Sequence, residues 1–178
     1  LYPLGSDAVI VAYGDSLTYG TGAPRSDSYP AVLSRLIKIN VINAGIPGET
    51  TTQGLKRLPS MLEKYNPSLV LLCLGGNDVL KKVPAKTISA NLKKMVALIQ
   101  SHGAQVFLIA VPEARLTLSV PDYYQNIANE FDIPVDTETL PDLLGDRSQK
   151  SDSVHLNRSG YRRFAERIAE QLKQYGAL

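Results

Sequence analysis

The stretch Ala8-Val9-Ile10-Val11-Ala12-Tyr13-Gly14-Asp15-Ser16 joins an apolar, β-branched run directly to a turn that opens with glycine. Runs of this kind are typical of strands that are buried on both faces of a parallel sheet. Three similar runs follow, and a weaker one comes later; they cover residues 39–42, 69–74, 106–111 and 133–135. The sequence therefore predicts about five strands, each ending near a turn rich in glycine, proline or polar residues.

Segments with helical period separate these runs. Apolar residues recur at helical spacing over residues 29–37, 55–65, 88–99 and 124–131, and again in a last helix that starts near Asn157. Pro59 is expected to kink or restart the second helix, and residues 137–153 are expected to form a long loop with about one helical turn. Strands that alternate with helices imply right-handed βαβ units. The fold class is thus α/β, a three-layer doubly wound sheet with helices on both faces, formed by one domain over residues 1–178.

Composition excludes several classes of protein. Nineteen basic and 17 acidic residues leave a net charge of +2, too little to indicate a nucleic-acid partner. The longest apolar run is far shorter than the roughly 18 residues that suggest a membrane span. The one cysteine, Cys73, lies inside a predicted strand and is expected to be a core residue. Because the chain starts without Met or a leader, the expected location is periplasmic or secreted after leader removal, with the cytoplasm as the alternative.

The turns that follow the predicted strands carry the polar residues of interest. Ligands of doubly wound sheets bind outside the carboxyl ends of the strands, so the turns 14–18, 43–48 and 75–78 should gather at one edge. Ser16 lies in the first of these turns and is a candidate nucleophile. A serine in such a turn is by itself more often a turn or N-cap residue.

Histidine is the usual base for such a serine, and the chain has only two histidines. His102 lies at the end of a predicted helix, where it is expected to cap carbonyl groups. His155 precedes the last helix and follows Asp152 by three residues, so that the carboxylate can hold Nδ1 while Nε2 faces a serine. The alternative is that Asp152 or Ser153 merely begins the last helix and that His155 is exposed.

Acyl transfer also requires hydrogen-bond donors for the developing oxyanion. The backbone N–H groups of Ser16 and Gly45 and the side-chain amide of Asn77 are candidates for a three-donor oxyanion hole. Gly45 suits this role because a residue without Cβ lets the backbone approach a substrate closely. Each residue alone is equally typical of an ordinary turn.

In order along the chain, these blocks resemble those of the GDSL or SGNH hydrolase superfamily. The resemblance rests on Gly14-Asp15-Ser16-Leu17, Gly45, Gly75-Gly76-Asn77-Asp78 and Asp152-Ser153-Val154-His155, and it runs through nearly the whole chain. It is greatest to small bacterial esterases of the arylesterase and thioesterase I/lysophospholipase L1 type. Members often carry glycine after the aspartate and proline after the histidine of the last block, where this chain has Ser153 and Leu156.

The resemblance implies a flavodoxin-like fold and a serine esterase for short to medium acyl esters, with thioesters and lysophospholipids as further candidates. Ser16 would be the nucleophile, His155 the base and Asp152 its partner, with no cofactor or metal and a small-molecule acyl ester as substrate. Asp15 and Asp78 are expected to hold the turns, and Leu17, Leu116 and Leu118 to line an acyl pocket. The alternatives are a carbohydrate O-acetylesterase and a non-catalytic module that binds a phosphate or nucleotide, although the P-loop pattern is absent. The sequence predicts no oligomeric state.

Overall fold

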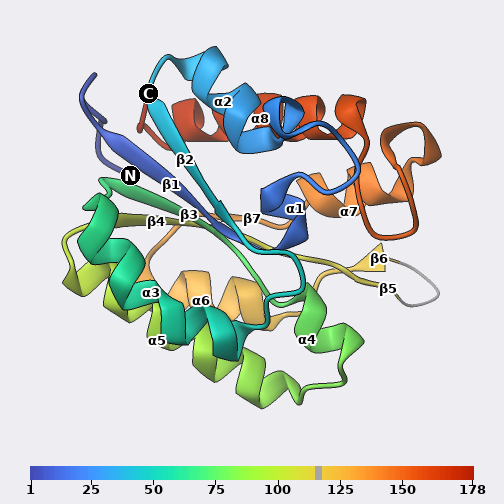
Figure 1. Cartoon of the computed structure of the whole chain (residues 1–178). Helices are drawn as coiled ribbons and strands as arrows, with labels where there is room; N and C mark the ends of the chain where they lie inside the picture. The colour runs from blue at the N-terminus through green and yellow to red at the C-terminus, as the bar shows by residue number, and fades with distance from the viewer. Residues whose placement is uncertain (115–117) are drawn as a thin grey trace.

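A computed structural model describes residues 1–114 and 118–178 of the chain. Its main sheet has five strands, all paired in parallel, in the order β2-β1-β3-β4-β7 (Figure 1). Their bounds are β1 Val9–Gly14, β2 Asn40–Gly45, β3 Leu69–Cys73, β4 Gln105–Ile109 and β7 Val135–Asp136. The predicted doubly wound sheet of about five parallel strands is confirmed.

Helices cover both faces of this sheet. Figure 1 shows α2 and α8 on one face and α3, α5 and α6 on the other. Their bounds are α2 Tyr29–Ile37, α8 Arg158–Gln174, α3 Thr51–Tyr65, α5 Ala85–Ser101 and α6 Tyr123–Phe131. The shorter elements are α1 Ser16–Tyr19, α4 Gly76–Leu80, α7 Thr139–Gly145, the 3-10 turns η1 Arg25–Asp27 and η2 Arg147–Gln149, and the antiparallel pair β5 Glu113–Ala114 and β6 Leu118–Ser119.

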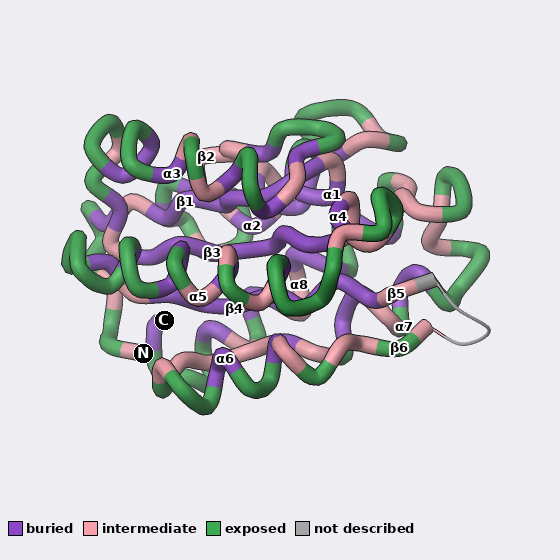
Figure 2. Tube along the Cα trace, turned by 90° about the horizontal axis from the view of Figure 1, so that it is seen from below, coloured by how far each residue is buried: buried purple, intermediate pink, exposed green. Residues whose placement is uncertain are grey.

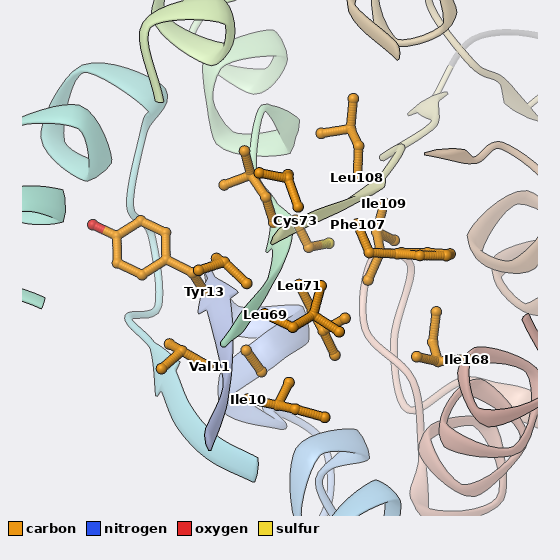
Figure 3. Close-up of a cluster of buried hydrophobic side chains, with 14 of the residues drawn as sticks. Ile10, Val11, Tyr13, Leu69, Leu71, Cys73, Phe107, Leu108, Ile109 and Ile168 are labelled. Atoms are coloured by element: carbon orange, nitrogen blue, oxygen red, sulfur yellow. The ribbon is translucent and has the colours of Figure 1, made fainter. Parts of the chain in front are cut away.

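The core lies in two layers, one on each face of the sheet. The register pairs Ala12 with Leu71 and Leu71 with Phe107, which places these three side chains on the face covered by α2 and α8. On that face the rings of Tyr29 and Phe164 lie 4.2 Å apart. The central strands are buried along most of their length (Figure 2), and their side chains fill the space between sheet and helices (Figure 3). Cys73 is fully buried, as predicted.

Several helix ends follow signals in the sequence. Asn157 caps α8, since its Oδ1 accepts from the backbone N–H of Gly160 at 3.0 Å. Thr50 and Gln53 form a capping box at the start of α3. Pro59, however, does not restart that helix, which is one element from Thr51 to Tyr65; the expected restart is wrong.

The expected long loop at 137–153 is also wrong, because it contains α7 and η2. Leu140, Leu143 and Leu144 are buried on one face of α7, at spacings of three and four residues. Pro141 lies in the first turn of this helix, where a missing N–H costs no hydrogen bond.

The strand order reverses between β1 and β3, so this sheet has its topological switch point there. The turns after these two strands carry Ser16 and Asn77, which places both residues beside the crevice that the topology creates. Among the helices of the described ranges, none is both long enough and apolar enough to cross a membrane.

Candidate active site

Ser16 is the first residue of α1, immediately after β1. A Cβ on Gly14 would overlap the hydroxyl of Thr18, so the tight turn into α1 requires glycine. Asp15 caps α1, because its Oδ1 accepts from the N–H of Leu17 at 3.0 Å. The N–H of Ser16 itself has no acceptor in the part of the chain that the structure describes. The serine therefore presents both its hydroxyl and a free backbone donor at the helix start.

His155 reaches this serine from the loop before α8. Its Nε2 lies 2.9 Å from Oγ of Ser16, and its Nδ1 lies 2.8 Å from Oδ2 of Asp152. The other carboxylate oxygen of Asp152 accepts from the N–H groups of Val154 and His155, each at 2.8 Å. The structure thus brings Ser16, His155 and Asp152 into one chain of hydrogen bonds. The alternative in which Asp152 begins the last helix does not hold, because Asn157 caps that helix.

The state of Asp152 fixes the direction of these bonds. Partial burial raises the pKa of its carboxyl, but the hydrogen bonds from His155 and the two backbone N–H groups outweigh burial and hold the pKa below its usual value. Asp152 is therefore an anion near neutral pH. An anion at Nδ1 requires a proton on that nitrogen, which leaves Nε2 of the neutral ring free to accept from the Ser16 hydroxyl.

Asn77 lies in α4, which follows β3 through Gly75 with a φ of 125°. Its Nδ2 donates to Oδ2 of Asp15 at 3.0 Å and to the backbone carbonyl of Glu49 at 3.1 Å. Asp15 is almost fully buried, and burial raises the pKa of its carboxyl to about 6 despite the Leu17 N–H bond. The amide of Asn77 is therefore held in place from two sides, beside the serine turn.

Gly45, the third expected oxyanion donor, lies elsewhere. It is buried at the end of β2, and its N–H donates to Oδ1 of Asn43 at 3.0 Å. A Cβ on Gly45 would overlap the backbone nitrogen of Tyr19, so the missing Cβ admits α1 rather than a substrate. Gly45 is also not among the residues that line the pocket beside Ser16. The structure thus contradicts its expected role.

Gly48, three residues further on, has the properties that were expected of Gly45. It is exposed, its φ is 78°, and a Cβ would meet no atom within 4 Å. Its N–H has no acceptor among the residues described, and the next residue, Glu49, supplies the carbonyl that binds Asn77. The turn contains two glycines, Gly45 and Gly48. Strand β2 extends through Gly45, so only Gly48 lies in the loop beyond the sheet.

Asp78 is buried beneath the site rather than in it. Its Oδ2 accepts from the N–H of Thr51 at 2.8 Å, and its Oδ1 accepts from the Thr51 hydroxyl at 2.6 Å. These bonds tie the start of α3 to α4.

An apolar pocket opens beside Ser16, Asn77 and His155. Its apolar walls come from α1, from α4, from the segment that follows β4, from β6 and from α7. The apolar residues are Leu17, Val79, Leu80, Val111, Pro112, Leu118 and Leu144. Leu17 and Leu118 thus line the pocket, whereas Leu116 lies outside the described residues. Leu144 was missed in the sequence because α7 was expected to be loop.

The second histidine lies away from this site. His102 is the exposed C-cap of α5, just before β4 begins, whereas the site lies beyond the carboxyl ends of the strands. Within residues 1–114 and 118–178, no three His, Cys, Asp or Glu side chains gather as a metal-binding group.

A serine, a histidine and a carboxylate in hydrogen-bonded sequence, beside a switch-point pocket, form the arrangement that serine hydrolases of several unrelated folds share. The chain belongs to the GDSL-like lipase/acylhydrolase family, whose sequence profile matches residues 12–163.

Named relatives agree with this membership. The chain is 31% identical over 172 residues to thioesterase 1/protease 1/lysophospholipase L1 of Escherichia coli K12, with 92% of this chain and 83% of that protein covered. It is 40% identical over 107 residues to an arylesterase of Vibrio mimicus; this match covers 57% of the chain and 54% of the relative. Among solved structures, the psychrotrophic esterase EstA from Pseudoalteromonas sp. superposes with a TM-score of 0.84 at 26% identity, over 95% of this chain and 98% of that one.

Proposed function

We propose that this chain, taken as one catalytic domain over residues 1–178, is a serine esterase that hydrolyses short to medium acyl esters. The observation that carries the proposal is the continuous chain from Ser16 Oγ through His155 to Asp152, with separations of 2.9 and 2.8 Å. A serine hydroxyl is a weak nucleophile until an adjacent base takes its proton, and this geometry supplies that base.

The reaction follows the two halves of acyl transfer. Ser16 attacks the ester carbonyl while Nε2 of His155 takes the hydroxyl proton, and the resulting imidazolium is stabilised by the Asp152 carboxylate. His155 then gives this proton to the leaving alcohol, which leaves an acyl group on Ser16. Water, deprotonated by the same nitrogen, releases the acid and restores the serine.

The oxyanion hole that we propose uses the N–H groups of Ser16 and Gly48 and the amide of Asn77. The free N–H groups of both backbone donors support this choice, and Gly48 replaces Gly45 in it. Both protons of the Asn77 amide are engaged, with Asp15 and with the Glu49 carbonyl. One of these bonds must therefore be shared or exchanged when negative charge develops on the substrate oxygen.

The substrate class follows from the walls of the pocket. Its aliphatic lining fits an acyl chain, and each methylene buried there contributes about 0.8 kcal/mol. The names of the relatives add aryl esters, acyl thioesters and lysophospholipids as leaving-group classes to test.

An organophosphonate tests the proposal, since only an activated serine forms a covalent adduct with it; the related esterase EstA is described as inhibited by monoethylphosphonate. We expect the wild-type protein to be labelled once, at Ser16, and to hydrolyse p-nitrophenyl esters. Ser16→Ala should lose both properties and keep its thermal unfolding temperature.

His102→Gln is the matched control for the base, because it removes the other histidine. It should be labelled and active like the wild type, whereas His155→Gln should be neither. Turnover that persists in Ser16→Ala would refute Ser16 as the nucleophile. A wild type that is neither labelled nor active would favour the non-catalytic phosphate-binding alternative.

A further inference from the structure

A polar cluster that lies next to the site, and that the reaction does not use, centres on Arg57 in α3. Its Nε donates to Oε1 of Glu49 at 2.8 Å, and its Nη2 donates to Oε2 of Glu49 at 2.6 Å. Nη2 also donates to the backbone carbonyl of Ala44 at 3.0 Å. The guanidinium therefore joins α3 to the end of β2 and to the loop that follows this strand.

This ion pair is deeply placed. The Glu49 side chain is only 5% exposed and that of Arg57 26%. The guanidinium carbon lies 4.1 Å from the centre of the Tyr13 ring, and the Tyr13 hydroxyl donates to the Gly54 carbonyl at 2.7 Å. Separating the two side chains would leave a buried charge without compensation, which is strongly unfavourable. The pair therefore holds the backbone at Glu49 in a fixed position relative to α3.

The pair holds the loop between β2 and α3. The stretch from Ile46 to Gly48 is exposed, and Gly48 has no neighbour around its Cβ position. The loop is anchored at Glu49, whose N–H donates to the Ile46 carbonyl at 3.2 Å and whose side chain binds Arg57. The carbonyl of the same Glu49 accepts from the Asn77 amide at 3.1 Å. One residue thus connects the buried ion pair to both the Gly48 peptide and the Asn77 amide.

We propose that Arg57 and Glu49 are a positioning pair for the oxyanion hole: their bidentate ion pair sets the places of the Gly48 N–H and the Asn77 amide. This inference rests on the proposed function, because it assigns the pair to the oxyanion donors of that reaction. Neither side chain lines the pocket, so neither is expected to touch substrate.

Two variants test the pair. Arg57→Lys keeps the positive charge and loses the fork, while Glu49→Gln keeps the shape and loses the negative charge. Because removal of one oxyanion donor costs about 100- to 1000-fold in kcat, a displaced donor should cost about 10- to 100-fold. KM should stay within about threefold, since the donors bind the transition state more strongly than the ground state.

Arg162→Lys is the matched control, because Arg162 forms an ion pair of 3.0 Å with Glu166 on the exposed surface of α8. Its kcat should stay within about twofold of the wild type. In every variant, kcat is calculated per site titrated with the organophosphonate, so unfolded protein is not counted. If Arg57→Lys does not fold, Glu49→Gln, which preserves the side-chain volume, decides the question.

The double variant separates positioning from general stability. If the two residues act as one unit, the double variant should have a kcat no more than about threefold below that of the slower single variant. Unfolding temperatures that fall while kcat per titrated site stays within about twofold of the wild type would overturn the inference and leave the esterase intact. Absence of labelling and turnover in the wild type would instead overturn the proposed function itself.

Discussion

Asp15 provides a sharp test of the electrostatics beside Ser16. The residue is 3% exposed, and burial raises the pKa of its carboxyl from 3.8 to about 6. The Asp15→Asn substitution removes this titration and retains an oxygen that can accept from the Leu17 N–H. The substitution also changes the contact with Asn77, but the cost of that change does not vary with pH. Any change with pH in the stability difference between wild type and variant therefore reports the titration of the carboxyl.

The sign follows from linkage. Because the pKa of Asp15 is higher in the folded protein than in the unfolded chain, the folded state takes up a proton as the pH falls through about 6. Its contribution to stability is fully present below about 3.8 and is lost as the pH rises through about 6. Between about pH 7 and pH 5, this proton uptake should add about 1.3 kcal/mol to the free energy of unfolding of the wild type.

The assay is urea unfolding of both proteins at several pH values across that range. The free energy of unfolding of the wild type minus that of Asp15→Asn should rise by about 1.3 kcal/mol as the pH is lowered. Asp146→Asn is the control: Asp146 is exposed, and hydrogen bonds from Ser148 lower the pKa of its carboxyl, so its linkage lies at lower pH. A difference for Asp15→Asn that is as flat as that of the control would refute the reasoning, since it would show that the buried carboxyl titrates in its ordinary range.

Four further substitutions test the geometry of the site. Asn77→Ala should lower kcat by about 100- to 1000-fold with little change in KM in steady-state assays, and a loss confined to thermal stability would assign Asn77 to the turn alone. Gly45→Ala should destabilise the fold by about 3 kcal/mol in urea unfolding, because the new Cβ would overlap the backbone of α1. Gly48→Ala should cost about 1–2 kcal/mol, because alanine is strained at a left-handed φ. Equal costs would contradict the packing described for Gly45. Leu118→Ser should reduce kcat/KM for octanoyl esters more than for acetyl esters, and a uniform reduction would show that Leu118 does not contact the acyl chain.

The strands and the order of the turns could be predicted because their signals are local. Short apolar runs bounded by turns, such as residues 69–74, are typical of central strands, and helices between them favour parallel pairing. The spacing of Asp152 and His155 allows their contact, but it is equally typical of a helix start, and only the matching blocks elsewhere in the chain favour the contact that the structure shows.

The errors arose where distant packing decides the outcome. Residues Asn43 to Gly45 lack an apolar pattern, yet they extend β2 because they pair with the end of β1, and this extension moves the turn glycine from Gly45 to Gly48. The buried leucines of α7 carried a helical signal, but Pro141 and Gly145 resemble loop residues until α8 is there to cover them. Neither outcome can be worked out from neighbours in the sequence.

The hydrogen bond between Ser16 and His155 joins residues that are 139 positions apart. Along the chain, Ser16 lies just after the first strand of the sheet, and His155 lies after the last one. The growing chain therefore holds no complete serine and histidine pair until all five strands of the sheet have been made. A chromogenic ester would then report the end of folding rather than its beginning, since turnover requires the contact between these two distant residues.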